Sequence, residues 1–266
     1  MHPQSTSTFR SSRLSLWERP AAGRVRVPTG FTLVELLVVI GIIAVLAALV
    51  TPAVMRAQAS ARNAAIKAEI DMLHMAIMTY KNEYGSFPPA LDTTLSASSP
   101  AGKHLARLFP RCGNVATQLS GALPAGVSIT GTNAVAFWLK GYTDDPTSPL
   151  DPTSDRKKLY DFDMSRVNQS TGSYYPTGKP GSPYLYINSA MYTAAPYAGG
   201  MSTVPGAFRM TVAGDALPFG NTAYDFANPD TFQILCAGRD EVFGNDDDLS
   251  NFWPSTRRDY LDSLKQ

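Results

Sequence analysis

Apolar residues are distributed most unevenly in the first third of this 266-residue chain. Fifteen consecutive residues, Leu36 to Val50, carry no charge and no strongly polar side chain. The wider stretch 31–55 is long enough to cross a bilayer as an α-helix, which needs about 20 mostly apolar residues. Glu35 interrupts this stretch near its beginning. Because a carboxylate in hydrocarbon costs about 3 kcal/mol even on lenient insertion scales, such a residue usually has a function and a partner.

After Pro52 the pattern becomes amphipathic. Large apolar residues recur every three or four positions, the spacing that lines one face of a helix. They are Ile66, Ile70, Leu73, Ile77, Tyr80 and Tyr84. Glycine and proline in "YGSFPP" at 84–89 are helix stop signals. We therefore expect one long helix from Phe31 to about Gly85, interrupted or kinked at Pro52, with its amphipathic half at 56–86. His74 is expected on the helix surface beside the stripe.

The remaining residues, 87–266, have the pattern of a mixed domain. Strand-like runs bounded by turn residues occur at 183–188, 208–212 and 231–237. Three strands separated by loops predict an antiparallel sheet packed on the amphipathic half of the long helix, an α+β fold. Short helices are predicted at 104–109 and 132–141, and most of 90–130 is predicted to be loop. The aspartates of "TDDPTSPLDPTSD" are expected to be solvated turn residues, namely Asp144, Asp145, Asp151 and Asp155.

The charge of the chain is balanced overall but not locally. With 23 Lys and Arg against 22 Asp and Glu, the total charge does not point to nucleic acid. Residues 1–30, however, hold five arginines and one glutamate. A basic leader, an apolar run and a mildly acidic body indicate an exported or membrane-inserted protein whose N-terminus stays in the cytoplasm. An ordinary secretory signal is hard to reconcile with Glu35, and a simple membrane anchor is a further alternative.

The two cysteines leave the redox state open. Cys112 and Cys236 are compatible with one disulfide in an oxidising compartment, or with two partly buried thiols.

The segment "PTGFTLVE" at 28–35 resembles the processing signal of type IV pilins and type II secretion pseudopilins. In that family prepilin peptidase, a membrane aspartyl peptidase, cuts after the glycine and methylates the new N-terminus. The resemblance implies that the leader 1–30 is removed by a cut between Gly30 and Phe31. Glu35 would then neutralise the new α-amino group of its own chain or of a neighbouring subunit, because burying two opposite charges as a pair costs less free energy than burying each alone.

The resemblance also implies a place and a set of partners. The protein would be a single-pass inner-membrane protein with a periplasmic body, assembled later into a periplasmic or extracellular filament. Its partners would be prepilin peptidase, the inner-membrane assembly platform, minor pseudopilins and other copies of itself. The expected role is a structural subunit of a type II secretion pseudopilus. The long body, with an insertion at about 90–180, leaves an alternative role open. The protein would then be a minor pilin that binds a ligand at a filament tip in adhesion or DNA uptake.

The acidic loop, defined as residues 237–249, is the second candidate site. It follows a predicted strand and holds five carboxylates and an amide within nine residues. Crowded carboxylates repel one another, and a hard cation such as Ca²⁺ relieves the repulsion. The loop and "GSPYLY" at 181–186 resemble the calcium loop and a strand of the major pseudopilin, although Glu241 replaces the family's glycine. The resemblance implies calcium ligands at Asp240, Asn245, Asp246 and Asp248, and a solvated acidic turn is the alternative.

Motifs for catalysis are missing from the sequence. It contains no phosphate-binding glycine loop, no His-Glu-x-x-His and no Gly-x-Ser-x-Gly. A basic groove with interleaved aromatic residues, which would indicate nucleic-acid binding, is also missing. We therefore expect a protein that is not an enzyme and does not bind nucleic acid.

Overall fold

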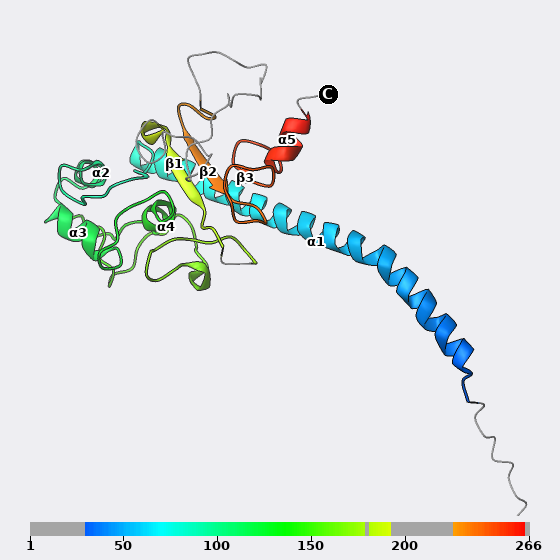
Figure 1. The fold of residues 1–266 in the computed structure, drawn as a ribbon. Coiled ribbons are helices and arrows are strands. Elements are labelled where there is room, and N and C mark those ends of the chain that lie inside the picture. The colour runs from blue at the N-terminus through cyan, green and yellow to red at the C-terminus, as the bar shows by residue number, and fades with distance from the viewer. Residues whose placement is uncertain (1–29, 179–180, 193–225, 264–266) are drawn as a thin grey trace, which may run out of the picture. The chain divides into compact units, whose positions relative to one another are not determined.

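The computed structural model describes residues 30–178, 181–192 and 226–263. The chain divides into two compact units, Met1–Pro52 (unit 1) and Ala53–Gln266 (unit 2). The predicted long helix is present as α1, Leu33–Tyr84, and contributes residues to both units (Figure 1). With the small antiparallel sheet described below, it confirms the predicted α+β fold.

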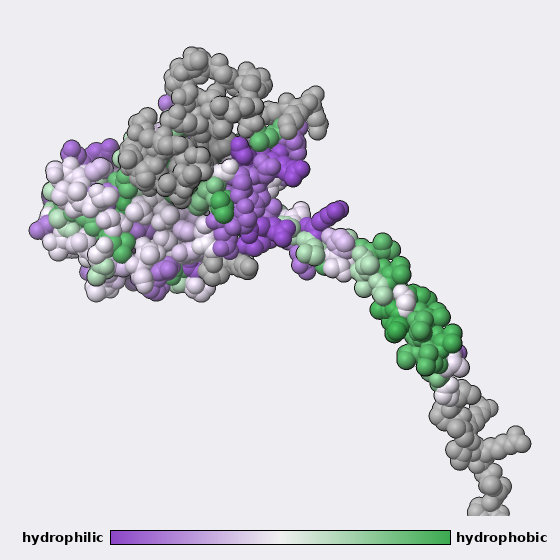
Figure 2. Space-filling view, in the orientation of Figure 1, coloured by the Kyte–Doolittle hydropathy of each residue, from purple (hydrophilic) through white to green (hydrophobic). Residues whose placement is uncertain are grey.

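Unit 1 exposes the apolar half of α1. Every described residue up to Pro52 is solvent-exposed, and the space-filling view shows the hydrophobic side chains gathered along this part of the helix (Figure 2). Within the described chain, α1 is the helix that is long and apolar enough to cross a membrane. The helix continues through Pro52, and the hydroxyl of Thr51 donates to the carbonyl oxygen of Ala47 at 2.7 Å.

Unit 2 is built on the amphipathic half of α1. The predicted stripe from Ile66 to Tyr80 is buried, and Tyr84 at its end is half-buried. Burial of each such side chain contributes about 1.5–3 kcal/mol. His74 is not the surface residue that the sequence suggested. It is half-buried, its ring centroid lies 4.9 Å from that of Phe232, and Asn251 bonds its Nδ1 at 3.0 Å.

The sheet has three antiparallel strands in the order β1, β2, β3. They are β1 Leu185–Asn188, β2 Phe232–Cys236 and β3 Leu249–Ser250. In the register, Leu185 faces Leu235 and Cys236 faces Leu249. Every strand residue is buried. β1 and β2 lie within the predicted runs at 183–188 and 231–237, so these two strand predictions were correct apart from their ends. The predicted strand at 208–212 lies outside the described residues, and β3 was not predicted because two residues form no recognisable pattern.

The region 90–180 holds more helix than predicted. Its helices are α2 Pro100–Leu108, α3 Val115–Gly121, α4 Ala134–Leu139 and the 3₁₀ turn η1 Met164–Arg166. The short helix predicted at 104–109 is present as α2, but it begins earlier, at Pro100, because Ser99 caps it by accepting from the amide of Gly102 at 3.3 Å. Asn114 caps α3 in the same way. Residues of α2, α3 and α4 belong to the same core as α1.

The rest of the described chain adds η2 Ser189–Met191 and α5 Arg257–Ser263. Asp145 and Asp151 are turn residues as predicted, because their carboxylates accept from the amides of Thr147 and Thr153. The two cysteines do not form a disulfide: Cys112 is half-buried and Cys236 is buried as free thiols.

Candidate functional site

The N-terminal candidate site begins in exposed backbone. Gly30 and Phe31 precede α1, and Phe31 is 82% exposed. A Cβ added at Gly30 would meet no atom within 4 Å. The structure therefore presents the bond between these residues outside any helix and without a covering side chain.

Glu35 has a partner that the sequence-based interpretation missed. Its Oε2 accepts from the amide of Thr32 at 2.9 Å and from the Thr32 hydroxyl at 2.8 Å. The amide of Glu35 in turn donates to the Thr32 hydroxyl at 3.2 Å. Thr32 and Glu35 thus form a capping box, in which the N-cap and the third helical residue satisfy each other's backbone groups. The spacing Thr-x-x-Glu was the sequence signal that could have predicted this capping box. The carboxylate of Glu35 is therefore already stabilised in the uncut chain.

The acidic loop does not gather its four predicted ligands. Asn245 donates its amide to Asp240 at 2.6 Å and to the carbonyl oxygen of Val242 at 2.9 Å. Asp246 is exposed and lies 3.6 Å from Arg257. Among residues 30–178, 181–192 and 226–263, no three His, Cys, Asp or Glu side chains are grouped as a metal site.

Asp248 differs from the other carboxylates of the loop because it is 0% exposed. Its Oδ2 accepts from the amide of Gly244 at 2.7 Å, whereas Oδ1 has no hydrogen-bond partner in the described chain. Burial, together with the neighbouring Asp247, raises the pKa of Asp248 to about 7. An unpartnered buried carboxylate oxygen is a suitable ligand for a hard cation. In this conformation only Asp248 fits the predicted calcium site.

Glu241 of the acidic loop has a φ of 66°. This left-handed conformation is one that glycine adopts without strain. Its carbonyl oxygen accepts from the hydroxyl of Ser182 at 2.7 Å, which ties the loop to the start of the β1 segment.

A buried ionic cluster, missed from the sequence, ties α1 to the rest of unit 2. Glu69 is 4% exposed and accepts hydrogen bonds from Tyr174 and Tyr184, each at 2.6 Å. Arg166 binds both of its carboxylate oxygens, one at 2.9 Å and the other more closely. Burial by itself raises the pKa of Glu69, but the hydrogen bonds from Arg166 and the tyrosines hold it below its usual value. The sequence signal that could have predicted this cluster was a glutamate on the same helix face as Ile66 and Ile70, which indicates a buried carboxylate that needs partners.

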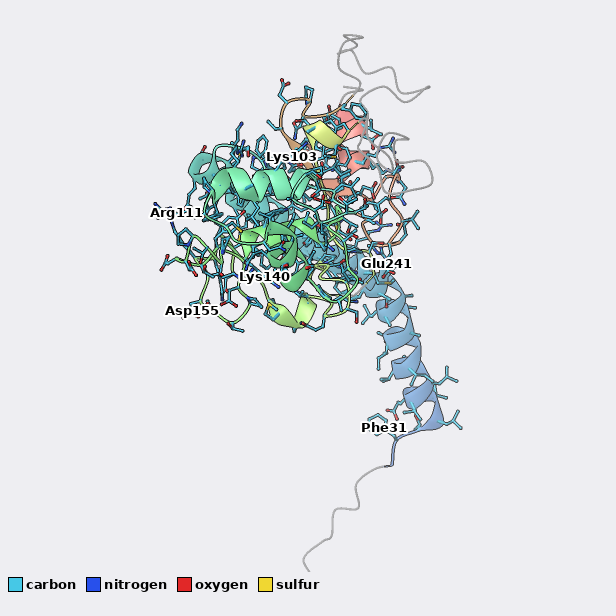
Figure 3. The ribbon with its side chains drawn as sticks, turned by 90° about the vertical axis from the view of Figure 1, so that its left-hand side faces the viewer. Phe31, Lys103, Arg111, Lys140, Asp155 and Glu241 are labelled. Atoms are coloured by element: carbon cyan, nitrogen blue, oxygen red, sulfur yellow. The ribbon has the colours of Figure 1, made fainter. Side chains whose placement is uncertain are left out.

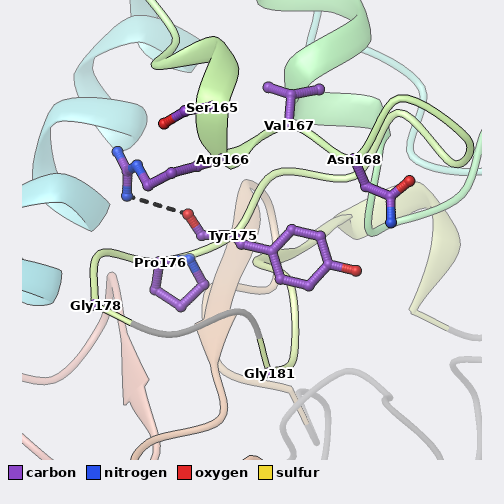
Figure 4. Close-up of a pocket in the computed structure, with 8 residues that line it drawn as sticks. All are labelled: Ser165, Arg166, Val167, Asn168, Tyr175, Pro176, Gly178 and Gly181. Carbon is purple, nitrogen blue, oxygen red and sulfur yellow. Dashed lines mark hydrogen bonds between the residues drawn. The ribbon is translucent and has the colours of Figure 1, made fainter.

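A surface cavity of about 490 Å³ lies beside this cluster. Figure 4 shows Arg166 at its edge, with the guanidinium donating to the carbonyl oxygen of Tyr175 at 3.1 Å. Another of its bonds goes to the hydroxyl of Thr177 at 2.9 Å. Because its donors are engaged by the protein, the arginine acts here as a connector between segments.

The fold and the N-terminal site together define a class of protein: an exposed apolar helix with a capped start, followed by an α+β body packed on the same helix. Residues 28–51 match the family model of the prokaryotic N-terminal methylation motif. The match includes Gly30, Phe31 and Glu35, and it indicates a type IV pilin-like substrate of prepilin peptidase. Comparison with curated proteins and with solved structures gave no match.

Proposed function

We propose that this protein is a structural subunit of a type II secretion pseudopilus or a related type IV pilus-like filament. The observation that carries the proposal is the methylation motif at 28–51 at the start of a helix whose apolar side chains are exposed. A motif of this kind indicates a structural subunit rather than an enzyme. The exposed apolar surface needs a partner, which is first the bilayer and then other copies of the same helix.

The proposed mechanism is assembly. Prepilin peptidase removes residues 1–30 and methylates the amino group of Phe31. Residues 31–55 hold the subunit in the inner membrane with unit 2 in the periplasm, until the assembly platform extracts it. In the filament, Glu35 neutralises the amino group of Phe31, its own or a neighbour's, because a buried pair of opposite charges costs less than two separate ones.

Mass spectrometry of the N-terminal peptide of the membrane-extracted protein tests this proposal. We expect a peptide that begins with methylated Phe31 in cells that contain prepilin peptidase, and an uncut leader in cells that lack it. A Gly30→Leu variant should retain residues 1–30, because the side chain is placed at the cleaved bond. A mature N-terminus near Ala53 or beyond would contradict the assignment.

A minor subunit that binds a ligand at a filament tip is the second candidate role. It is favoured by a cationic surface cavity in the region 90–180, described in the next subsection. Copy number separates the two roles, because a shaft subunit is abundant in purified filaments and a tip subunit is scarce. Quantitative mass spectrometry of sheared filaments measures this ratio.

We also propose that the acidic loop binds Ca²⁺, with Asp248 as its central ligand and Asp240, Asn245 and Asp246 as further ligands. The buried, unpartnered Oδ1 of Asp248 supports this proposal. Binding would have to replace the present bond between Asn245 and Asp240. When bound, the cation would neutralise the crowded carboxylates.

Chelation tests the calcium proposal. A chelator should lower the melting temperature of the full chain, and Asp240→Ala combined with Asp248→Ala should abolish that shift. Asp145→Ala, which alters an exposed turn aspartate, is the matched control. If the wild-type protein melts identically with and without chelator, the loop is an acidic turn without a metal.

A further inference from the structure

A second cavity in unit 2 is lined by three basic and two acidic side chains. The cavity, here called the Lys140 cavity, has a volume of about 390 Å³, within the range of small-ligand sites. Residues that line it include Lys140, Arg156, Tyr160, Asp155 and Ser154. A smaller cavity of about 190 Å³ is also lined by Lys140 and Arg156.

The two cations of the Lys140 cavity, Lys140 and Arg156, are both half-buried, and neither forms an ion pair within 4 Å in the described chain. Asp151 acts on Arg156 electrostatically from a greater distance, and its carboxylate is engaged by Thr153 and Ser154. Burial, and then the charge of Arg156, lower the pKa of Lys140. Two neighbouring, partly desolvated cations are unfavourable by themselves, and an anion placed against them relieves both desolvation and repulsion.

Arg156 is fixed before any ligand binds. Its Nε donates to the carbonyl oxygen of Asp151 at 3.2 Å, and its Nη2 donates to that of Leu150. An arginine held in this way loses little side-chain entropy when it binds an anion. The helix dipole explains a cation at Lys140, the C-cap of α4, but a six-residue helix does not explain a second cation beside it.

The remaining walls of the Lys140 cavity add two other kinds of contact. Asp155 and Ser154 are exposed and supply oxygen atoms that accept hydrogen bonds. Tyr160 supplies part of an aromatic face, and Lys158 is paired with Asp161 at 3.5 Å. The cavity thus offers two cations, oxygen acceptors and part of an aromatic face. A ligand that contacts all of these carries one anionic group, several hydroxyl donors and an apolar ring face.

We propose that the Lys140 cavity binds an acidic sugar, a hydroxylated ring with one carboxylate or phosphate group. The anionic group lies against Lys140 and Arg156, the hydroxyls donate to Asp155 and Ser154, and the ring packs on Tyr160. This site goes beyond the role of a filament subunit, and it rests on unit 2 alone. Failure of cleavage at Gly30 would therefore leave it standing.

Calorimetric titration of the full chain, in a detergent without a sugar headgroup, tests the proposal. The probes are glucuronate, glucose 6-phosphate, glucose and inorganic phosphate. We expect glucuronate or glucose 6-phosphate to bind at least about tenfold more tightly than glucose and inorganic phosphate. Among the four probes, only glucuronate and glucose 6-phosphate carry both an anionic group and a hydroxylated ring. The stronger of the two identifies the anionic group.

Lys140→Gln should weaken the binding of the acidic sugar by at least about tenfold, whereas the melting temperature stays the same or rises, because a partly buried unpaired charge is removed. Lys103→Gln and Arg111→Gln are matched controls at exposed cations, which Figure 3 shows apart from Lys140. Asp155→Asn should weaken the acidic sugars relative to inorganic phosphate, because it removes an acceptor that only the sugar hydroxyls use, whereas the negative charge it removes repels both ligands. The proposal is overturned if neither acidic sugar binds, if glucose or phosphate binds equally well, or if Lys140→Gln binds like the controls.

Discussion

At the scale of single residues, Glu69 combines a cost and a gain. Moving a carboxylate out of water costs several kcal/mol, and Arg166, Tyr174 and Tyr184 offset that cost through direct hydrogen bonds. The cluster matters more for the segments that it connects than for its net contribution to the free energy of folding. It joins the middle of α1 to segments about a hundred residues later, and so fixes how those segments of unit 2 pack on the amphipathic half of the helix.

We predict that Glu69→Gln lowers the free energy of unfolding by about 3 kcal/mol, because it leaves the partly buried Arg166 with the exposed Asp163, 3.4 Å away, as its remaining acidic partner in the described chain. Urea unfolding, followed by the fluorescence of Trp138 and Trp253, measures this change. Glu83→Gln is the matched control, since its ion pair with Lys157 is largely exposed and should contribute less than about 1 kcal/mol. Equal losses in the two variants would contradict the proposed importance of the buried pair.

His104 is a second residue whose burial has a measurable consequence. It lies on α2, its Nε2 is 2.7 Å from the hydroxyl of Tyr80, and burial followed by the charge of Arg107 lowers its pKa to about 4. The folded protein therefore holds it neutral, whereas the unfolded chain protonates it near pH 6.5. Between these values the unfolded state binds more protons, so stability rises with pH.

We expect the contribution of His104 to be complete above about pH 6.5 and to be lost progressively as the pH falls to about 4. The full loss is on the order of 3 kcal/mol. The measurement is the difference in unfolding free energy between the wild-type protein and His104→Gln across this range. A difference that does not change with pH would show that the imidazole does not titrate on unfolding.

At the scale of elements, the end of α4 shows why a glycine was needed. The helix predicted at 132–141 occupies Ala134–Leu139, and Gly141 follows with a φ of 75°. The chain then pairs Tyr142 with Lys157 in an isolated bridge. A Cβ at Gly141 would lie 1.8 Å from the carbonyl oxygen of Lys157, which is backbone and cannot give way easily.

We predict that Gly141→Ala destabilises the protein by about 3 kcal/mol, through backbone strain together with this collision. Gly85→Ala separates the two causes. Its φ is 79°, but its added Cβ meets nothing within 4 Å, so only the strain of about 1 kcal/mol remains. Thermal unfolding of both variants measures the contrast, and equal shifts would show that the collision relaxes without cost.

Elements that carry their own period or caps were predictable, and those defined by pairing were not. The stripe on α1 predicted both the helix and the buried face. Strand β3 has two residues and exists because Leu249 pairs with Cys236, which no local pattern encodes. Helix α3 was missed although Asn114 caps it, because its short sequence has only one buried residue, Leu119.

At the scale of the whole molecule, the exposed apolar half of α1 requires a partner outside the chain. The bilayer can supply it before assembly, and neighbouring helices can supply it in a filament. Glu35 is bonded to Thr32 in the uncut chain, so cleavage at Gly30 would offer its carboxylate a second, charged partner. The same residue can thus stabilise the helix start first and the filament later.

We expect Glu35→Ala to be cleaved and methylated normally but to fail in filament assembly, because the amino group of Phe31 would be buried without a counter-charge. Thr32→Val is the informative control, since it removes the capping partner and keeps the carboxylate, and it should still assemble. Sheared-filament yield, normalised to the processed subunit in membranes, is the readout. Normal assembly of Glu35→Ala would remove the proposed role of the glutamate.

The sequence by itself determined the long helix, its apolar and amphipathic halves, the processing motif and the α+β class. These features depend on residues within about four positions of one another, where periodicity, capping and motif order are visible. Only the tertiary structure decided that Glu69 meets Arg166 across 97 positions, that Asp248 is the one buried carboxylate of the acidic loop, and that Lys140 lies with Arg156. These arrangements follow from the packing of distant segments, where burial and pairing energies are set by contacts that no local pattern records.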